Sequence, residues 1–397
     1  MRRAVKITHN FNHSLHLWQK VQHMGILNSL FGNGISEPLQ DQITQKIKAC
    51  IDPTSKQSLE ALKAISELQL KKGTLTLKIS MPYPCKSLWP SIEQSVQHEI
   101  LQIEEIEKVN ISFDTKVVSH DAQKGVSPLP NIKNIIAIAS GKGGVGKSTT
   151  SVNLALALQQ EGANVGLLDA DIYGPSIPTM LNIKEKPQSI DGKSMQPLPA
   201  YGLQVMSIGA LIEEDSPMIW RGPIVTQTLT QLLKETNWDD LDYLVIDLPP
   251  GTGDVQLTLS QQIPVTGAVI VTTPQQVSLI DAKKGLKMFE KVEIPVLGII
   301  ENMSTHVCSN CGHEEAIFGA HGGENMAKEY KVDFLGALPL DKRIREEADN
   351  GKPTVTAEPL SEIAQKYRHM AHKISAQIGI QKRNYANVFP NIVIQNT

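Results

Sequence analysis

Short, nearly continuous apolar runs characterise the chain from residue 134 onward. They are I-I-A-I-A at 135–139, V-G-L-L at 165–168, Y-L-V-I-D at 243–247, A-V-I-V-T-T at 268–273, V-L-G-I-I at 296–300 and F-L-G-A-L at 334–338. Runs of this kind are typical of parallel strands that are buried on both faces of a sheet. Because helical stretches separate them, we predict an α/β fold with a doubly wound, mostly parallel sheet. A last helix is expected over 358–378.

Residues 36–115 follow a different pattern. An amphipathic segment containing Ile43 and Ile47 precedes D-P-T at 52–54, which should end a helix. Alternating apolar residues at 75, 77 and 79 predict one strand of a hairpin whose turn contains Gly73. A helical stretch to about residue 105 and the alternating V-N-I-S-F at 109–113 come next. The order α-β-β-α-β predicts a small α/β domain ahead of the large one.

These patterns predict five segments. Residues 1–35 are an N-terminal extension, expected to be disordered; its acid-poor, basic start also fits a transit peptide or a start codon placed too early. Residues 36–115 form the small domain, and 116–132, without periodicity and with two prolines near the end, form a linker. Residues 133–380 form the large domain. Residues 381–397 are a polar tail without the basic amphipathic character of a membrane-docking helix.

Composition excludes several classes of protein. The 397 residues are 41% hydrophobic and 20% charged, as in soluble globular proteins. A net charge of −3 gives no basic surface for nucleic acid, and no apolar run approaches the ~18 residues of a membrane span. The cysteines are too few for a disulfide scaffold, which indicates a reducing, cytoplasmic location. There are four: Cys50, Cys85, Cys308 and Cys311.

The segment G-K-G-G-V-G-K-S at 141–148 lies between a predicted strand and a predicted helix. In such a loop, glycines let backbone N–H groups point at phosphate, Lys147 reaches the β- and γ-phosphates, and the Ser148 hydroxyl binds Mg²⁺. The context therefore predicts a site for ATP and Mg²⁺. Its nucleotide-binding residues are Gly141, Lys142, Gly143, Gly144, Val145, Gly146, Lys147, Ser148 and Thr149.

Carboxylates follow two of the predicted strands. Asp169 and Asp171 end L-L-D-A-D, and Asp247 ends Y-L-V-I-D. In P-loop enzymes a strand-end aspartate belongs to the Mg²⁺ shell and another group orients the attacking water. We assign Asp247 to the metal shell and Asp171 to the water or the metal. Asp169 is either part of this site or a structural cap of its strand.

Cys308 and Cys311 form a C-x-x-C motif, which supplies half of a four-ligand metal site. A second copy of the chain, related by a two-fold axis, would supply the other half. From spacing alone three sites remain open: a bridging [4Fe–4S] cluster, a zinc site in which His306 or His313 adds nitrogen, and a redox dithiol. Cys50 is expected in the core.

The string K-G-G-V-G-K-S-T resembles the deviant Walker A motif of the MinD/ParA/nitrogenase iron-protein class of P-loop ATPases. The resemblance implies that Lys142 reaches across a dimer to the partner's phosphates. Four further stretches extend it: D-A-D-I-Y-G-P-S-I-P, M-I-W-R-G-P, V-I-D-L-P-P-G-T-G-D and N-M-S-T-H-V-C-S-N-C-G. Together they resemble the Mrp/ApbC family of iron–sulfur cluster carrier ATPases over 133 to about 375. Residues 36–115 are similar to the small iron–sulfur assembly domain often fused ahead of them.

The Mrp/ApbC resemblance implies a homodimeric ATPase carrying a labile [4Fe–4S] cluster on Cys308 and Cys311 of both chains. The cluster would come from a scaffold or donor and pass to apo iron–sulfur client proteins, with ATP hydrolysis tied to the cycle. The resemblance also places Asn302 and P-L-D at 339–341 around the adenine. It gives Cys85 a role in accepting or handing over the cluster, with a core cysteine as the alternative.

Two other functions compete with the carrier. A MinD/ParA-like positioning ATPase would need a basic membrane helix or a DNA-binding patch, and neither stands out in the sequence. The second alternative is a P-loop ATPase in which a structural zinc site bridges the two chains of the dimer.

Overall fold

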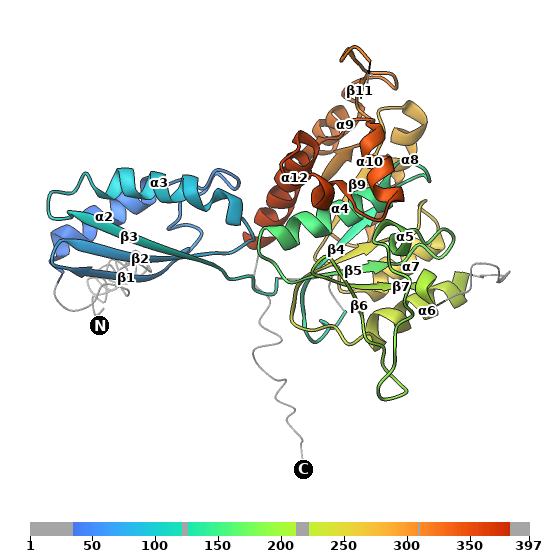
Figure 1. Cartoon of the computed structure of the whole chain (residues 1–397), viewed down its shortest axis with the longest axis horizontal. Coiled ribbons are helices and arrows are strands. Elements are labelled where there is room, and N and C mark those ends of the chain that lie inside the picture. The colour runs from blue at the N-terminus through green and yellow to red at the C-terminus, as the bar shows by residue number, and fades with distance from the viewer. Residues whose placement is uncertain (1–34, 121–125, 212–221, 309, 382–397) are drawn as a thin grey trace, which may run out of the picture. The chain divides into compact units, whose positions relative to one another are not determined.

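The structure, a computed structural model, describes residues 35–120, 126–211, 222–308 and 310–381 (Figure 1). The predicted N-terminal extension, except for residue 35, lies outside these ranges, as do residues 382–397 of the tail and most of M-I-W-R-G-P. Contacts divide the chain into two units. The smaller unit runs to Pro82 and covers Ser87–Lys116, and the larger contains Tyr83–Lys86 and the chain from Val117 onward.

The smaller unit has the expected element order. Its elements are α2 (Glu37–Ala49), β1 (Ile65–Lys71), β2 (Thr74–Met81), η2 (Lys86–Leu88), α3 (Trp89–Ile100) and β3 (Lys108–Thr115). Strands β1 and β2 form an antiparallel hairpin with Gly73 in its turn at φ 74°, and β3 pairs with β2 in parallel. Ile43 and Ile47 of α2 are fully buried, together with the inward residues of β2. The amphipathic pattern therefore marks the core face of this unit.

An eight-stranded sheet forms the centre of the larger unit. Its spatial order is β13-β10-β9-β4-β8-β5-β7-β6, and every neighbouring pair is parallel except β6 with β7. This confirms the predicted doubly wound, mostly parallel sheet, while the antiparallel edge pair was not predicted. The strands are β4 (Ile132–Ala139), β5 (Val165–Asp169), β6 (Leu198–Ala200), β7 (Leu203–Ser207), β8 (Leu241–Asp247), β9 (Gly267–Thr272), β10 (Val296–Glu301) and β13 (Phe334–Ala337).

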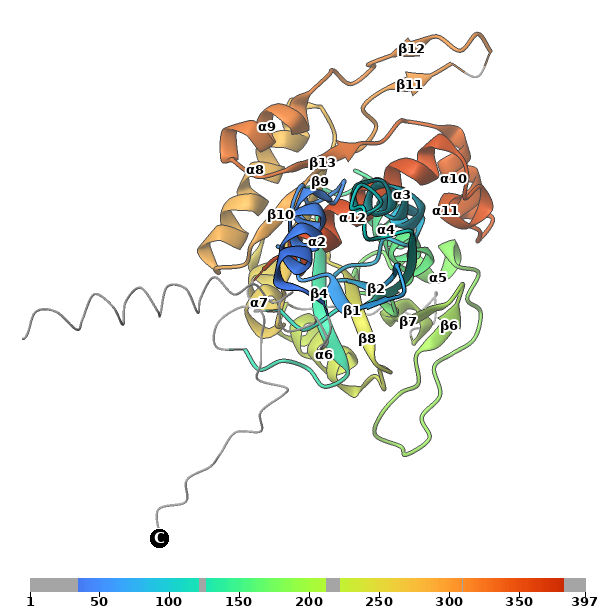
Figure 2. The ribbon, with the colours of Figure 1, turned by 90° about the vertical axis from the view of Figure 1, so that its left-hand side faces the viewer.

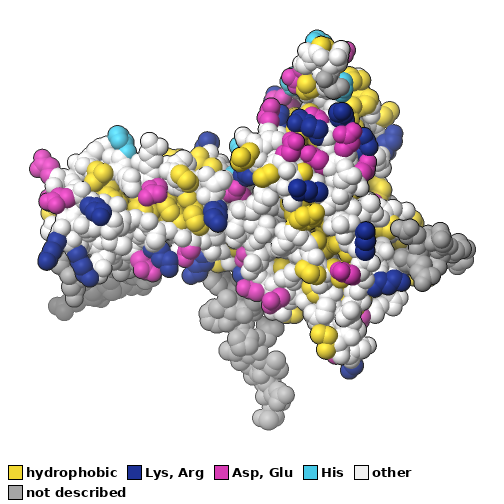
Figure 3. Space-filling view, in the orientation of Figure 1, with side chains coloured by type: hydrophobic (Ala, Val, Ile, Leu, Met, Phe, Trp, Pro, Cys, Tyr) yellow, Lys and Arg dark blue, Asp and Glu magenta, His cyan; other side chains and the backbone are white. Residues whose placement is uncertain are grey.

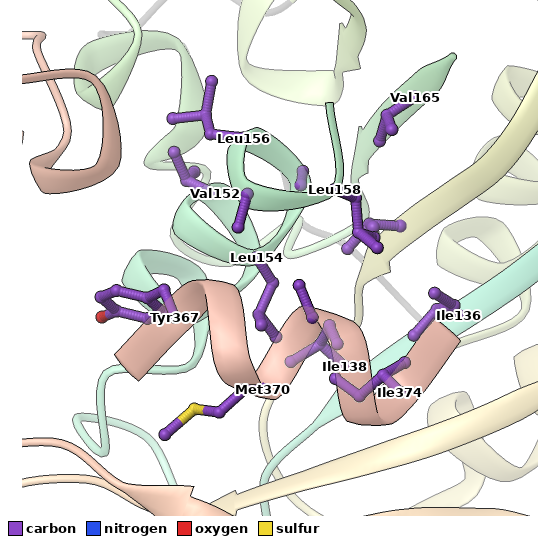
Figure 4. Packing of buried hydrophobic residues seen from close by; sticks show 14 of the residues in the cluster. Ile136, Ile138, Val152, Leu154, Leu156, Leu158, Val165, Tyr367, Met370 and Ile374 are labelled. Carbon is purple, nitrogen blue, oxygen red and sulfur yellow. The ribbon is translucent and has the colours of Figure 1, made fainter. Parts of the chain in front are cut away.

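Helices cover both faces of this sheet. One face packs against α4 (Lys147–Gln160) and α12 (Glu362–Gly379), and the other packs against α6 (Gly222–Glu235), α7 (Asp254–Gln262), α8 (Gln276–Lys291) and α9 (Gly322–Tyr330). Figure 4 shows Leu154 of α4 beside Met370 and Ile374 of α12. Ile136 and Ile138 belong to this core, whereas their neighbours along β4 belong to the opposite one. Both faces of β4 are thus apolar, which explains its continuous apolar run.

Part of the predicted linker packs on the larger unit. Val117 is buried in its core, and the backbone N–H of His120 donates to Oδ1 of Asn134 at 3.2 Å. Shorter elements of this unit are η3 (Ile208–Ala210), α5 (Ile177–Met180), α10 (Lys342–Asp349), α11 (Thr354–Ala357), β11 (His306–Val307) and β12 (Glu314–Glu315).

Candidate nucleotide site and cysteine hairpin

The loop between β4 and α4 depends on glycine at three positions. Gly144 and Gly146 have φ of 81° and 82°, in the left-handed region that other residues rarely adopt. A Cβ atom on Gly141 would lie 2.2 Å from the carbonyl carbon of Asp281, because the loop packs against the backbone of α8. The glycines thus allow a tight turn directly before α4 begins at Lys147, and place backbone N–H groups at a helix N-terminus.

Strand register brings the predicted carboxylates to this loop. Asp247 of β8 lies opposite both Ile138 of β4 and Asp169 of β5. The Lys147 Nζ atom is 2.8 Å from Oδ1 of Asp247 and 3.5 Å from Oδ2 of Asp171, and it also donates to Oγ of Ser148 at 3.3 Å. The structure therefore gathers Lys147, Ser148, Asp171 and Asp247 in one cluster. Lys147 and Asp247 are buried.

Two carboxylate oxygens in this cluster suit a cation. Oδ1 of Asp171 and Oδ2 of Asp247 are buried and have no hydrogen-bond partner among the described residues. Carboxylate and hydroxyl oxygens are the ligands that Mg²⁺ prefers, so these two atoms and the Ser148 hydroxyl fit the ion. No three His, Cys, Asp or Glu side chains within the described ranges group as a metal site. Phosphate oxygens and water would therefore have to complete its shell.

Asp169 faces the protein backbone. Its Oδ1 accepts from the N–H of Asp171 at 3.2 Å, and its Oδ2 accepts from the N–H of Ile177 at 3.3 Å and from Oγ of Ser207 at 3.0 Å. Burial, followed by the charge of Asp247, raises the pKa of Asp169 to about 7. Burial also raises the pKa of Asp171, against the opposing effect of Lys147. Of the two roles left open, the structural one fits Asp169, which anchors the loop that carries Asp171.

A cavity of about 370 Å³ opens beside the phosphate loop. Gly146 and Thr149 form one wall, Asn302 and Met303 a second, and Pro339–Asp341 a third. Side chains of α5 and α10 close it, and these walls were not predicted. The Asn302 Nδ2 atom donates to the carbonyl of Val145 at 2.9 Å. The volume is in the range of small-ligand pockets. Thus the residues placed around the adenine by resemblance do share one cavity with the phosphate loop.

The two lysines of the loop differ in environment. Lys147 is 5% exposed and paired, whereas Lys142 is exposed together with Gly143 and Gly144. Its ammonium makes no ion pair with any carboxylate of the described residues, although its carbonyl accepts from Oγ of Ser140 at 2.9 Å. Lys142 is thus available to a group outside its own chain.

Cys308 and Cys311 lie at the end of a projecting hairpin (Figure 2). Its strands pair His306 with Glu315 and Val307 with Glu314, and the N–H of Cys308 donates to the carbonyl of His313 at 2.9 Å. Cys308 is half-buried and Cys311 is exposed. Figure 3 shows histidine and hydrophobic side chains on this projection, at the top of the view. The hairpin, which was not predicted, presents both thiols at the surface of the larger unit.

Hydrogen bonds favour a thiolate at this hairpin. The backbone N–H groups of Asn310 and Cys311, and then the Cys311 thiol, lower the pKa of Cys308. His306 and His313 do not complete a set of three ligands with the two cysteines in the described chain. A single chain thus offers two sulfur ligands.

The other two cysteines are buried. Cys50 is 1% exposed, its thiol donates to the carbonyl of Lys46 at 3.3 Å, and burial raises its pKa to about 11. This fits the predicted core position. Cys85 is fully buried, as expected for the core alternative.

No helix among the described residues combines the length and the apolar character that a membrane span requires.

Known protein families match both units. A family described as NUBPL iron-transfer P-loop NTPase matches residues 131–375, and one described as iron–sulfur cluster assembly protein matches residues 40–113. The chain is 51% identical to the iron–sulfur cluster carrier protein of Escherichia coli (strain K12) over 327 residues, covering 82% of this chain and 89% of that protein. It is 49% identical to the iron–sulfur cluster transfer protein NUBPL of Mus musculus over 262 residues, covering 66% and 82%.

A solved structure also resembles this chain. It is the nucleotide-binding protein in complex with ADP from Archaeoglobus fulgidus, with 36% identity and a TM-score of 0.51, covering 59% of this chain and 92% of that one. The phosphate loop, the strand-end aspartates and the cysteine hairpin thus occur on a fold that resembles this solved structure. The chain belongs to the family of NUBPL-type iron-transfer P-loop NTPases and, by its sequence relatives, to the Mrp/ApbC group within it.

Proposed function

We propose that this chain is an ATP-hydrolysing carrier of a [4Fe–4S] cluster. It holds the cluster on Cys308 and Cys311 of two copies and transfers it to apo iron–sulfur proteins. The observation that carries the proposal is the hairpin with two surface thiols and a lowered pKa at Cys308. The names of the relatives in Escherichia coli and Mus musculus support it.

The phosphate loop and the cavity beside it support the proposed ATP binding. The base and ribose occupy the cavity at Asn302 and Pro339–Asp341, and the phosphates lie on the N–H groups that precede α4. Lys147 moves from its carboxylate partners to the β- and γ-phosphates. Ser148 and Asp247 hold Mg²⁺, which neutralises phosphate charge when bound. The ADP in the related Archaeoglobus fulgidus structure supports this reading.

Hydrolysis requires a positioned water and added positive charge. Asp171, held by the backbone contact to Asp169, orients the water that attacks the γ-phosphate. The exposed Lys142 of a second copy supplies the charge. A homodimer therefore completes the site.

The same dimer completes the cargo site. A [4Fe–4S] cluster takes four thiolates, and two copies of the hairpin supply four. Thiolates at the surface leave the cluster accessible for handover, which suits a carrier in a reducing compartment such as the cytoplasm. Clients and donors would approach this face.

Metal and sulfide analysis of anaerobically purified protein tests the cargo. We expect about four iron and four sulfide per two chains, with an absorption band at about 400 nm. Cys308→Ala and Cys311→Ala should abolish both, while the buried Cys50→Ala should keep them. If the same cysteines held zinc and no sulfide, the carrier function would be wrong, and the protein would be an ATPase with a structural zinc site that bridges the dimer. A dimer that holds neither iron nor zinc on these cysteines and nonetheless hydrolyses ATP would favour the alternative, a MinD/ParA-like positioning ATPase.

A further inference from the structure

A short connection joins the cavity to the cysteine hairpin. Asn302 and Met303 line the cavity, and Cys308 follows only five residues after Met303. We call residues 302–308 the connecting segment. Hydrogen bonds of Asn302, Ser304 and Thr305 attach it to the rest of the larger unit.

At its first end, the connecting segment is attached to the phosphate loop. The Asn302 side chain donates to the carbonyl of Val145, and its backbone N–H donates to the carbonyl of Thr272 at 2.8 Å. A Cβ atom on Gly146 would lie 2.1 Å from Nδ2 of Asn302, so the amide packs directly on the loop. The Asn302 side chain therefore links the phosphate loop to the connecting segment.

Further along, the connecting segment pairs with another wall of the cavity. The N–H and hydroxyl of Ser304 both donate to the carbonyl of Leu338, at 2.9 and 3.0 Å. The N–H of Leu340 donates to the carbonyl of Thr305 at 2.7 Å, and His306 forms a parallel bridge with Leu340. Leu340 itself lines the cavity. Both chain segments that hold the base of the hairpin are thus cavity walls.

Met303 has an unusual backbone conformation. Its φ of 56° lies in the left-handed region, which is rare for a residue of this kind. Strained residues at ligand sites commonly mark positions where the local backbone responds to a ligand. Met303 is placed where a ligand in the cavity would contact it, one residue before the pairing with Leu338 begins.

We propose that a nucleotide in the cavity orders the cysteine hairpin through the connecting segment, with Asn302 as the positioning residue. This rests on the proposed nucleotide site. A ligand that contacts both walls restrains both attachments of the hairpin base, and an isolated two-stranded hairpin is marginal by itself. Nucleotide thereby holds Cys308 and Cys311 in the arrangement that retains the cluster, and its loss loosens them for handover. By reciprocity, an ordered hairpin strengthens nucleotide binding.

Hydrogen–deuterium exchange of the metal-free, full-length protein with and without Mg-ADP tests this. We expect ADP to slow exchange in the peptide containing Cys308 and Gly312 at least threefold, although neither residue lines the cavity. Exchange at the start of α4, around Thr150, reports nucleotide binding itself. In Asn302→Ala at saturating ADP, the protection around Thr150 should persist and that of the hairpin should fall to nearly none.

Two further variants separate coupling from binding. Ser304→Ala removes a hydrogen bond to Leu338 outside the cavity. It should reduce hairpin protection even at saturating ADP, and should weaken ADP binding only by the coupling that is lost. Thr179→Ala alters the cavity wall on α5, and should keep hairpin protection once ADP saturates it. If ADP protects Thr150 in the native protein but leaves the hairpin unchanged, the coupling is refuted and the nucleotide site stands. If ADP protects neither, the nucleotide site of the proposed function is overturned, and the coupling with it.

Discussion

Asp169 and Asp247 are neighbours across two strands, yet they have different partners. Lys147 pairs with Asp247, whereas Asp169 is surrounded by backbone N–H groups and the Ser207 hydroxyl. Two buried carboxylates so close together disfavour a second negative charge. The raised pKa of Asp169 therefore keeps its carboxyl protonated at mildly acidic pH.

This arrangement predicts a pH dependence of stability. The pKa of Asp169 is raised from 3.8 to about 7, so between these values the native protein holds a proton that the unfolded chain has lost. The stabilisation that the protonated Asp169 carboxyl gives the native protein is therefore present at low pH and is lost as pH rises through this window. We expect the free energy of unfolding of the metal- and nucleotide-free protein to fall by up to about 1.4 kcal/mol per pH unit from this group. Urea denaturation from pH 4 to 8 measures it.

The matched variants for this titration are Asp169→Asn and Asp191→Asn. Asp169→Asn should remove this component of the slope. Hydrogen bonds from the backbone N–H groups of Ser194 and Lys193 lower the pKa of the exposed Asp191 to about 2, so its stabilisation is lost only as pH falls below about 4. Asp191→Asn should therefore leave the slope from pH 4 to 7 unchanged. An identical slope in Asp169→Asn would contradict the assignment.

The positions of site residues were predictable where a motif carries them. The phosphate loop, Asp171 and Asp247 follow from local spacing, because a loop after a parallel strand must lie at the same sheet edge as its neighbours' ends. Which of its two alternatives applies to Asp169 did not follow, because the partners of its carboxylate include Ser207 of β7. Which strand lies beside β5 is a matter of sheet order, and spacing along the chain does not reveal that order.

Among the elements, α4 has a special position because it carries the phosphate loop at its N-terminus and is buried along its length. Its buried residues include Lys147 and Leu154, and Leu154 packs against α12 (Figure 4). Burial on several sides also explains why its apolar residues show little amphipathic pattern. The packing of α12 on α4 thus supports the base of the nucleotide site.

We expect Leu154→Ala to lower the free energy of unfolding by about 2–5 kcal/mol. The side chain is 1% exposed, so its loss removes buried apolar surface and leaves a cavity between two helices. Chemical denaturation measures the change. Leu360→Ala is the matched control, since that leucine is 84% exposed and its loss should change stability by less than about 0.5 kcal/mol. Equal effects of the two substitutions would contradict the packing.

Elements were predictable in proportion to their length. All six apolar runs became strands of the large sheet: five are inner strands, and the last, β13, lies at an edge. Burial on both faces explains the clear pattern of the inner strands. Strands β11 and β12 have two residues each, too few for any periodicity, so the cysteine hairpin was missed. The four-residue α5 was missed for the same reason, and with it one wall of the cavity.

At the scale of the whole molecule, a single chain leaves two sites incomplete, one at the cysteine hairpin and one at the phosphate loop. The hairpin offers two thiols, and the phosphate loop presents an exposed lysine that pairs with no carboxylate of the described chain. A two-fold dimer would complete both at once, because each copy gives its partner what it lacks. The proposed dimer can therefore be tested through the lysine, independently of the cluster.

Lys142→Ala should lower ATP hydrolysis at least about 100-fold, as loss of a charge supplied in trans does elsewhere, but weaken nucleotide binding much less. Lys147→Ala is the comparison, and should weaken both hydrolysis and nucleotide binding.

Mixing two variants decides whether Lys142 acts across the dimer. In a dimer of Lys142→Ala with Asp171→Asn, one site keeps its own Asp171 and receives Lys142 from the partner. An equal mixture of these two inactive proteins should therefore recover about a quarter of native activity after subunit exchange. If Lys142 acted within its own chain, every site in the mixture would lack one group, and the mixture would stay inactive.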